Sequence, residues 1–90
     1  MNIKAHHRRE ERYEGMQLVY GTDEAAKEAI LAAIEAVKEE MKIGPKVYEN
    51  CDSRQPEKCA IYMEFEDEYD REGGEFFERV MRRLNIPCCG

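Results

Sequence analysis

The chain has 90 residues, of which 42% are apolar and 38% are charged, and its formal net charge is −6. This length indicates one small domain covering 1–90, and the apolar content excludes a disordered chain. The negative charge makes nucleic-acid binding unlikely, because most of the surface would repel a polyanion. No apolar run is long enough to span a membrane, and no apolar signal segment follows the charged N-terminus, so we expect a cytoplasmic protein.

The N-terminal segment 1–14 is locally basic and alternates only in its first half. This pattern fits an exposed edge strand or a partly ordered arm. Glu14 and Gly15 are typical of a turn. Residues 16–20 then form a short predicted strand, which Gly21 ends.

A long helix is the most strongly patterned element of the chain. We expect it to begin at Thr22 as the N-cap and to run to about Lys42. Gly44 and Pro45 stop it, because proline cannot continue a helix. Its apolar side chains recur at spacings of three and four. They are Ala26, Ile30, Ala33, Ile34, Val37 and Met41.

Two more strands and a second helix complete the predicted elements. Residues 46–50 and 60–66 form a hairpin with a longer polar loop, and the second strand alternates between apolar and polar residues. The second helix starts near Asp70 or Gly74 and ends near Asn85, a plausible left-handed cap. The tandem Gly73 and Gly74 obscure its first turn, because glycine is costly inside a helix. Its expected buried residues are Phe76, Phe77, Val80, Met81 and Leu84.

This succession predicts an α+β domain with two helices packed on one face of a small, mostly antiparallel sheet. The element order is β-α-β-β-α, with an extra strand in front if the N-terminal segment is ordered. It resembles a ferredoxin-like fold that lacks its final strand. The resemblance is one of element order alone, and a fold of this kind implies no particular function.

The placement of the four cysteines allows three hypotheses. Cys51 follows one strand of the predicted hairpin and Cys59 precedes the other, so the hairpin brings them close together. A disulfide between them would staple a marginally stable domain, and free thiols are the alternative. The third hypothesis is a zinc or soft-metal site, although the spacing is longer than that of a usual zinc knuckle. Its ligands would be Cys51, Cys59, Cys88 and Cys89, with His6 or His7 as a further candidate.

Charge is distributed unevenly along the chain. The N-terminal segment carries Arg8, Arg9 and Arg12, whereas 64–78 is strongly acidic. The two segments suggest self-association of the basic arm of one chain with the acidic region of another, or recognition of a basic protein partner. A divalent cation and a merely solvated acidic surface are the other readings. The acidic residues concerned are Glu66, Asp67, Glu68 and Asp70.

The motifs of common enzyme classes are missing, including the nucleophile elbow, the P-loop and the zinc-protease motif. We therefore lean against an enzyme and name no catalytic residue. The preferred hypothesis is a small cytoplasmic interaction or regulatory module, a homodimer that pairs through its sheet or its edge strand. The alternative is a thiol- or zinc-dependent domain that uses the cysteine hairpin and the C-terminal cysteine pair.

Overall fold

A computed structural model of the chain describes residues 3–11, 13–66 and 70–86, without the side chains of 70–72. Four strands and two helices confirm the predicted α+β class. In chain order the elements are β1 (Lys4–Glu10), β2 (Tyr13–Val19), α1 (Glu24–Met41), β3 (Lys46–Asn50), the short 3₁₀ helix η1 (Pro56–Lys58), β4 (Ala60–Glu66) and α2 (Asp70–Arg83).

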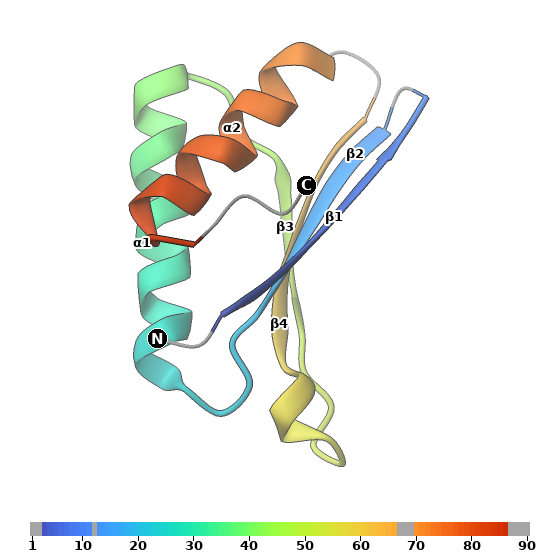
Figure 1. Cartoon of the computed structure of the whole chain (residues 1–90), viewed down its shortest axis with the longest axis vertical. Helices are drawn as coiled ribbons and strands as arrows, with labels where there is room; N and C mark the ends of the chain where they lie inside the picture. The colour runs from blue at the N-terminus through green and yellow to red at the C-terminus, as the bar shows by residue number, and fades with distance from the viewer. Residues whose placement is uncertain (1–2, 12, 67–69, 87–90) are drawn as a thin grey trace.

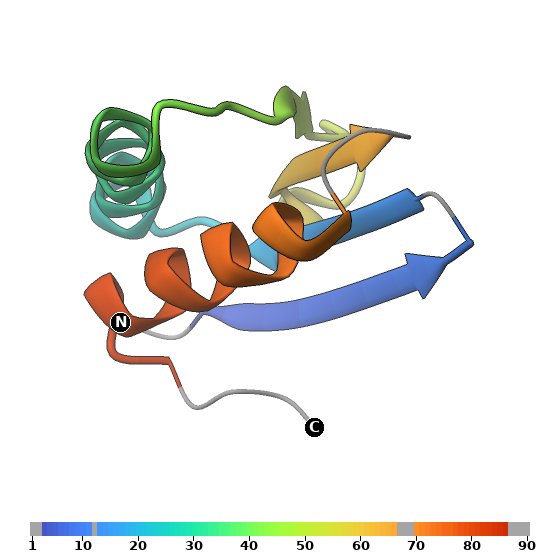
Figure 2. The same ribbon diagram turned by 90° about the horizontal axis from the view of Figure 1, so that it is seen from above.

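The sheet has the strand order β1-β2-β4-β3, and each neighbouring pair is antiparallel. Both helices lie against the same face of this sheet (Figure 1, Figure 2). Because β4 lies between β2 and β3, those two strands run parallel and α1 is the crossover between them. The element order is therefore β-β-α-β-β-α, and the expected ferredoxin-like order is not confirmed.

The core lies between the helices and the inner face of the sheet. The predicted apolar stripes of both helices are buried there, apart from Met41, which is only partly buried. From the sheet, Phe65 packs against Phe76 with ring centroids 5.5 Å apart in an edge-to-face arrangement. Each such aromatic or aliphatic side chain stabilises the fold by about 1.5–3 kcal/mol relative to the exposed state. The other inner-face residues of the core are Ala5, Met16, Leu18, Ile61 and Met63.

The limits of helix α1 lie within one residue of those predicted, which were an N-cap at Thr22 and an end at about Lys42. Its N-cap is Asp23 rather than Thr22, because the Asp23 side chain accepts a hydrogen bond of 3.0 Å from the amide of Ala26. At the other end Lys42 adopts a left-handed conformation with φ of 59°, before Gly44 is reached. After α2, Asn85 has φ of 57°, as expected of a left-handed cap.

The expected turn at Glu14 and Gly15 is wrong, since both residues lie inside β2. The chain turns earlier, after Glu10. Gly15 lies on the outer face of the sheet, and a Cβ atom there would overlap the hydroxyl group of Tyr62. The glycine is therefore needed for close approach of a side chain, a use that resembles a turn signal when only the sequence is known.

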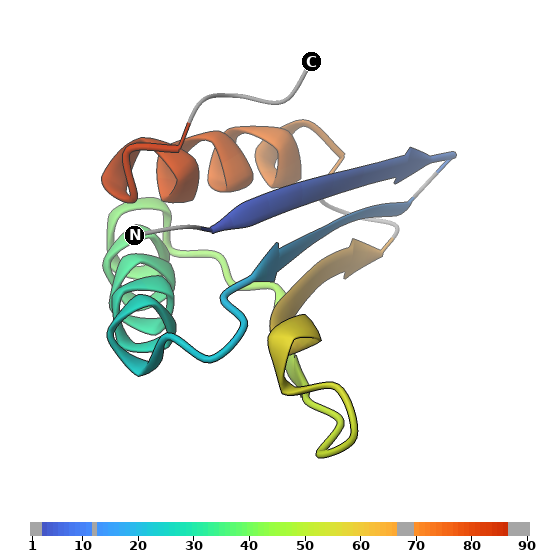
Figure 3. The same cartoon turned by 60° about the horizontal axis from the view of Figure 1, so that its bottom comes forward.

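The two ends of the sheet have different constructions (Figure 1, Figure 3). At one end of the sheet, β1 is followed by β2, and β4 is followed by α2. We call this the turn end. The end with the loop 51–59 and the start of α1 is the hairpin end. No helix in the described part of the chain is long and apolar enough to cross a membrane.

Candidate interaction surface

Strand β3 forms one edge of the sheet, and all five of its residues are exposed. Among the described residues, three large hydrophobic side chains are exposed, and two of them belong to β3. Val47 is 39% exposed and Tyr48 is 47% exposed, whereas the third, Leu31, lies on α1. An edge strand presents unpaired backbone groups, so exposed apolar side chains along it favour pairing with another strand.

Tyrosines gather around Glu64 on the outer face of the sheet, next to β3. The hydroxyl groups of Tyr13 and Tyr48 donate hydrogen bonds to the two oxygens of Glu64, at 3.0 and 3.1 Å. Tyr62 lies opposite Tyr48 in the register, and its hydroxyl group contacts that of Tyr13. The hydrogen bond to Glu64 raises the pKa of Tyr48, and burial followed by the charge of Glu64 raises that of Tyr62. These contacts hold the aromatic side chains in place beside the β3 edge.

The opposite edge, β1, carries Arg8 and Arg9, two of the three basic residues predicted to interact. Arg8 is exposed on the outer face and forms an ion pair of 2.7 Å with Glu10, two residues further along. Arg9 is exposed as well, opposite Glu14 in the register. Arg12 lies outside the described residues. The basic side chains of β1 are therefore partly neutralised within their own strand.

Among the predicted acidic residues, only Glu66 is described together with its side chain, and it lies at the turn end. Glu66 is exposed at the end of β4, opposite Tyr13 in the register. Asp70 begins α2, but its side chain is outside the described set, as are Asp67 and Glu68 entirely. The structure thus places Arg8, Arg9 and Glu66 at one end of the same molecule.

Further along α2, the acidic side chains are neutralised by arginines of the same helix. Arg79 pairs with Glu75 at 3.0 Å and Arg82 with Glu78 at 2.6 Å, both at a spacing of four residues. Arg79 and Arg83 also reach Glu40 of α1, and the hydrogen bond from Arg83 lowers the pKa of Glu40. Glu75 and Glu78 are therefore paired within their own helix, since such pairs form readily at this spacing.

One carboxylate at the turn end is buried, which the sequence did not suggest. The Glu14 side chain is only 4% exposed, and its Oε1 lies 2.8 Å from Nε2 of His7 on β1. Its Oε2 has no hydrogen-bond partner among the described residues. Gly73 and Gly74 in the first turns of α2 lie over this carboxylate, where a Cβ atom on Gly73 would be 2.9 Å from Oε2. The two glycines therefore allow α2 to approach a buried acid.

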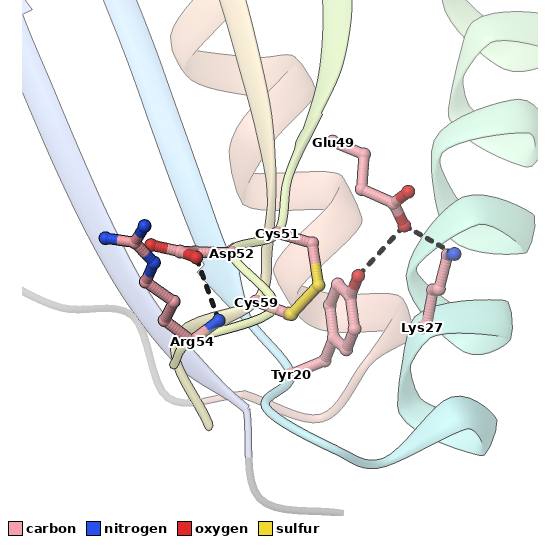
Figure 4. Close-up of a disulfide and its surroundings, with 7 residues drawn as sticks. All are labelled: Tyr20, Lys27, Glu49, Cys51, Asp52, Arg54 and Cys59. Atoms are coloured by element: carbon pink, nitrogen blue, oxygen red, sulfur yellow. Dashed lines mark hydrogen bonds and ion pairs between the residues drawn. A yellow bond between two sulfur atoms is a disulfide. The ribbon is translucent and has the colours of Figure 1, made fainter. Parts of the chain in front are cut away.

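At the hairpin end, Cys51 and Cys59 form a disulfide, which agrees with one of the three hypotheses for these residues. Figure 4 shows Tyr20 beside this bridge, with its hydroxyl group donating a hydrogen bond of 2.9 Å to Glu49. Lys27 of α1 pairs with the same carboxylate. The backbone oxygen of Cys59 accepts hydrogen bonds from the amides of Tyr20 and Gly21, at 3.0 and 3.1 Å. Cys59 thus connects the loop to the residues after β2, and Glu49 connects β3 to α1.

The predicted metal site stays a prediction. In the disulfide form, Cys51 and Cys59 supply no thiolate ligand, and Cys88 and Cys89 lie outside the described residues. Within the described ranges, no group of three or more histidine, cysteine or acidic side chains is arranged to hold a metal ion. His7 is already engaged with Glu14, and His6 points to the opposite face of the strand.

Comparison with known proteins adds no functional assignment to this geometry. No family model matches the chain, and neither a curated protein nor a solved structure matches it. Among the described residues, the exposed β3 edge with Val47 and Tyr48 is the feature that most favours an interaction with another chain.

Proposed function

We propose that the chain is a protein-interaction module that forms a homodimer by joining the β3 edges of two copies into one continuous sheet. The observation that carries this proposal is the exposure of Val47 and Tyr48 on an edge strand whose five residues are all exposed. A closed two-fold pairing would cover this edge in both copies at once.

The residues of β3 are suited to antiparallel pairing with themselves. A two-fold axis normal to the sheet keeps the outer faces of the two copies on the same side. Centred on Tyr48, it places Tyr48 opposite its own copy, Val47 opposite Glu49, and Lys46 opposite Asn50. In this register no like charges face each other, whereas a register centred on Glu49 would oppose two carboxylates.

The β1 edge is a poorer surface for self-pairing. Its exposed side chains are mostly charged or polar, including Lys4, Arg8 and Arg9, and none of the exposed large hydrophobic side chains of the described residues lies on it. Charged side chains on an edge strand are a common protection against such pairing. The sheet therefore has one protected edge and one edge open to a partner.

Light scattering coupled to size-exclusion chromatography tests the homodimer directly. We expect a concentration-dependent dimer, and the variant Val47→Lys/Tyr48→Lys should be monomeric with unchanged folding. The single variant Val47→Lys should also weaken the dimer, and Leu31→Lys is its matched control, because it introduces the same single charge at the similarly exposed apolar side chain on α1. Added salt should strengthen the dimer, since it screens the repulsion between two chains that each carry a net charge of −6. A wild-type chain that stays monomeric at all concentrations contradicts the proposal.

The cytoplasmic location expected from the sequence stays part of this proposal and has its own test. A lasting disulfide between Cys51 and Cys59 is more typical of an oxidising compartment. Alkylation of free thiols in acid-quenched cells, followed by intact mass measurement, distinguishes the two situations. Modification of both cysteines supports the cytoplasm, and their protection contradicts it.

A further inference from the structure

A groove on the outer face of the sheet lies at the hairpin end, away from β3. It encloses a volume of about 640 Å³ between the strands β1 and β2 on one side and η1 on the other. Its lining includes Lys4 and His6 of β1, Gln17 and Val19 of β2, and Glu57 and Lys58 of η1. No helix covers this part of the sheet, because both helices lie on the inner face (Figure 2).

The groove has an excess of positive charge in a chain that is acidic overall. Lys4 and Lys58 approach it from two different elements, and His6 adds an imidazole. Neither lysine forms an ion pair within the described ranges, unlike Lys27, Lys38 and Lys42, which all do. Glu57 is the acidic residue of the lining. Because two unneutralised ammonium groups converge on one hollow, it suits an anion.

The lining of the groove also has an apolar part. Val19 supplies an aliphatic surface, and Gly21 adds no side chain at all. Gly21 has φ of 66°, and its Cα lies so close to η1 that a Cβ atom would be 3.3 Å from the backbone oxygen of Glu57. Gln17 and Tyr20 complete the lining. This combination fits a ligand with an acidic group and a short apolar body.

The wall formed by η1 is held in place before any ligand arrives. The disulfide joins Cys59, the residue after η1, to Cys51 at the end of β3. The backbone oxygen of Cys59 also binds the amides of Tyr20 and Gly21. A preformed wall lowers the entropy that binding would otherwise cost.

We propose that this groove binds a small organic anion, with Lys4 and Lys58 contacting the acidic group and Val19 contacting the apolar body. Phosphate monoesters and carboxylates share this chemistry. The proposal does not depend on pairing through β3, because β1 and β3 are opposite edges of the sheet.

Titration of the ¹⁵N-labelled chain with phenyl phosphate, followed by amide chemical shifts, tests the proposal. We expect saturable shifts at Lys4, His6, Gln17, Gly21 and Lys58 and none at β3. Benzoate in place of phenyl phosphate shows whether a carboxylate serves equally well. Benzyl alcohol, which has no charge, should bind at least tenfold more weakly, and equal binding of this alcohol would overturn the anion assignment.

The variant Lys4→Glu/Lys58→Glu should weaken phenyl phosphate binding at least tenfold while keeping a folded amide spectrum. Lys38→Glu/Lys42→Glu makes the same change of charge at the end of α1, outside both the groove and β3, and should weaken binding less than about threefold, because distant exposed charges are screened. Equal losses in both variants, or no saturable shifts in the wild-type groove, would overturn the proposal. Because β3 is unchanged in the first variant, a lost dimer and a lost anion site give separate readouts.

Discussion

The two ends of the sheet are stabilised in opposite ways. At the turn end, a buried carboxylate, Glu14, is held by His7 and covered by the glycines of α2. At the hairpin end, a covalent bridge between Cys51 and Cys59 fixes an exposed loop. The first arrangement depends on noncovalent fit in a buried place, and the second depends on the redox state of two sulfur atoms.

This difference predicts how each end responds to substitution and to reductant. A buried acid destabilises the fold when its partner is lost, because the desolvated carboxylate is left without that hydrogen bond. A disulfide acts mainly by restricting the unfolded chain, so its loss leaves the native contacts of the loop in place. We therefore expect the turn end to respond to side-chain substitution and the hairpin end to respond to reductant.

The largest effect is expected for His7→Leu at the turn end. The substitution leaves the carboxylate of Glu14 buried without its partner and should lower the free energy of unfolding by about 3 kcal/mol. His6→Leu, on the exposed neighbour, is the matched control and should change stability little. Urea unfolding followed by circular dichroism measures both.

A second substitution makes this prediction sharper. His7→Leu/Glu14→Met removes the acid together with its partner, so it should recover most of the lost stability. If His7→Leu costs no more than His6→Leu, or if the double variant is less stable than the single one, the pair does not stabilise the turn end as argued.

At the hairpin end, Cys51→Ala/Cys59→Ala should lower the free energy of unfolding by about 2.5 kcal/mol, the loop-closure estimate for two cysteines eight residues apart. A thiol reductant should bring the wild-type chain to nearly the same unfolding midpoint and leave the variant unchanged. The loss caused by His7→Leu should be the same with and without reductant, since the two sites lie at opposite ends of the sheet (Figure 1, Figure 3). A wild-type midpoint that ignores the reductant contradicts the prediction.

A smaller effect distinguishes the two glycines of α2. Gly73→Ala should destabilise the chain by about 1–2 kcal/mol, because its Cβ would be 2.9 Å from Glu14 Oε2 and 3.0 Å from the Phe65 ring. Gly74→Ala meets its nearest atom, Glu14 Oε1, at 3.3 Å. The gain in helix propensity offsets much of that crowding, so Gly74→Ala should be close to neutral. Thermal unfolding of the two variants side by side tests this order, and equal losses would contradict it.

The contact of these glycines with Glu14 is a feature that the sequence alone could not predict. The helix patterns predicted the buried faces of α1 and α2, because a spacing of three and four residues reports the side of a helix that is covered. The tandem glycines weakened the predicted start of α2, and their purpose depends on Glu14, which is about sixty residues away. No local pattern contains that contact.

The candidate surfaces were predictable to different degrees. The closeness of Cys51 and Cys59 followed from the hairpin, which is a local element. The strand order was not predictable, because the pairing of β2 with β4 joins segments that lie far apart in the chain. The sequence did not predict the groove for the same reason, because Lys4 and Lys58 line it from segments that lie far apart in the chain.

The smallest expected effect concerns Tyr20 at the hairpin end. Burial first, and then the hydrogen bond to Glu49, raise the pKa of Tyr20 above its usual value of 10.0. Because the folded pKa is the higher one, the neutral phenol stabilises the fold below the pKa of the unfolded chain. This stabilisation is lost as the pH rises through the folded pKa. Tyr20→Phe should therefore reduce the alkaline loss of stability.

Replacing the acidic partners separates the two causes. In Glu49→Gln the pKa of Tyr20 should fall only part of the way, because the ring remains buried at 6% exposure. In Glu64→Gln the pKa of the exposed Tyr48 should fall most of the way, since its hydrogen bond to Glu64 is the main cause of the shift. Ultraviolet titration of tyrosinate, with Tyr20→Phe and Tyr48→Phe as references for each phenol, measures both shifts. A complete return of Tyr20 in Glu49→Gln would show that burial does not control this phenol, and that the hairpin end is more open to water than its packing against Cys59 implies.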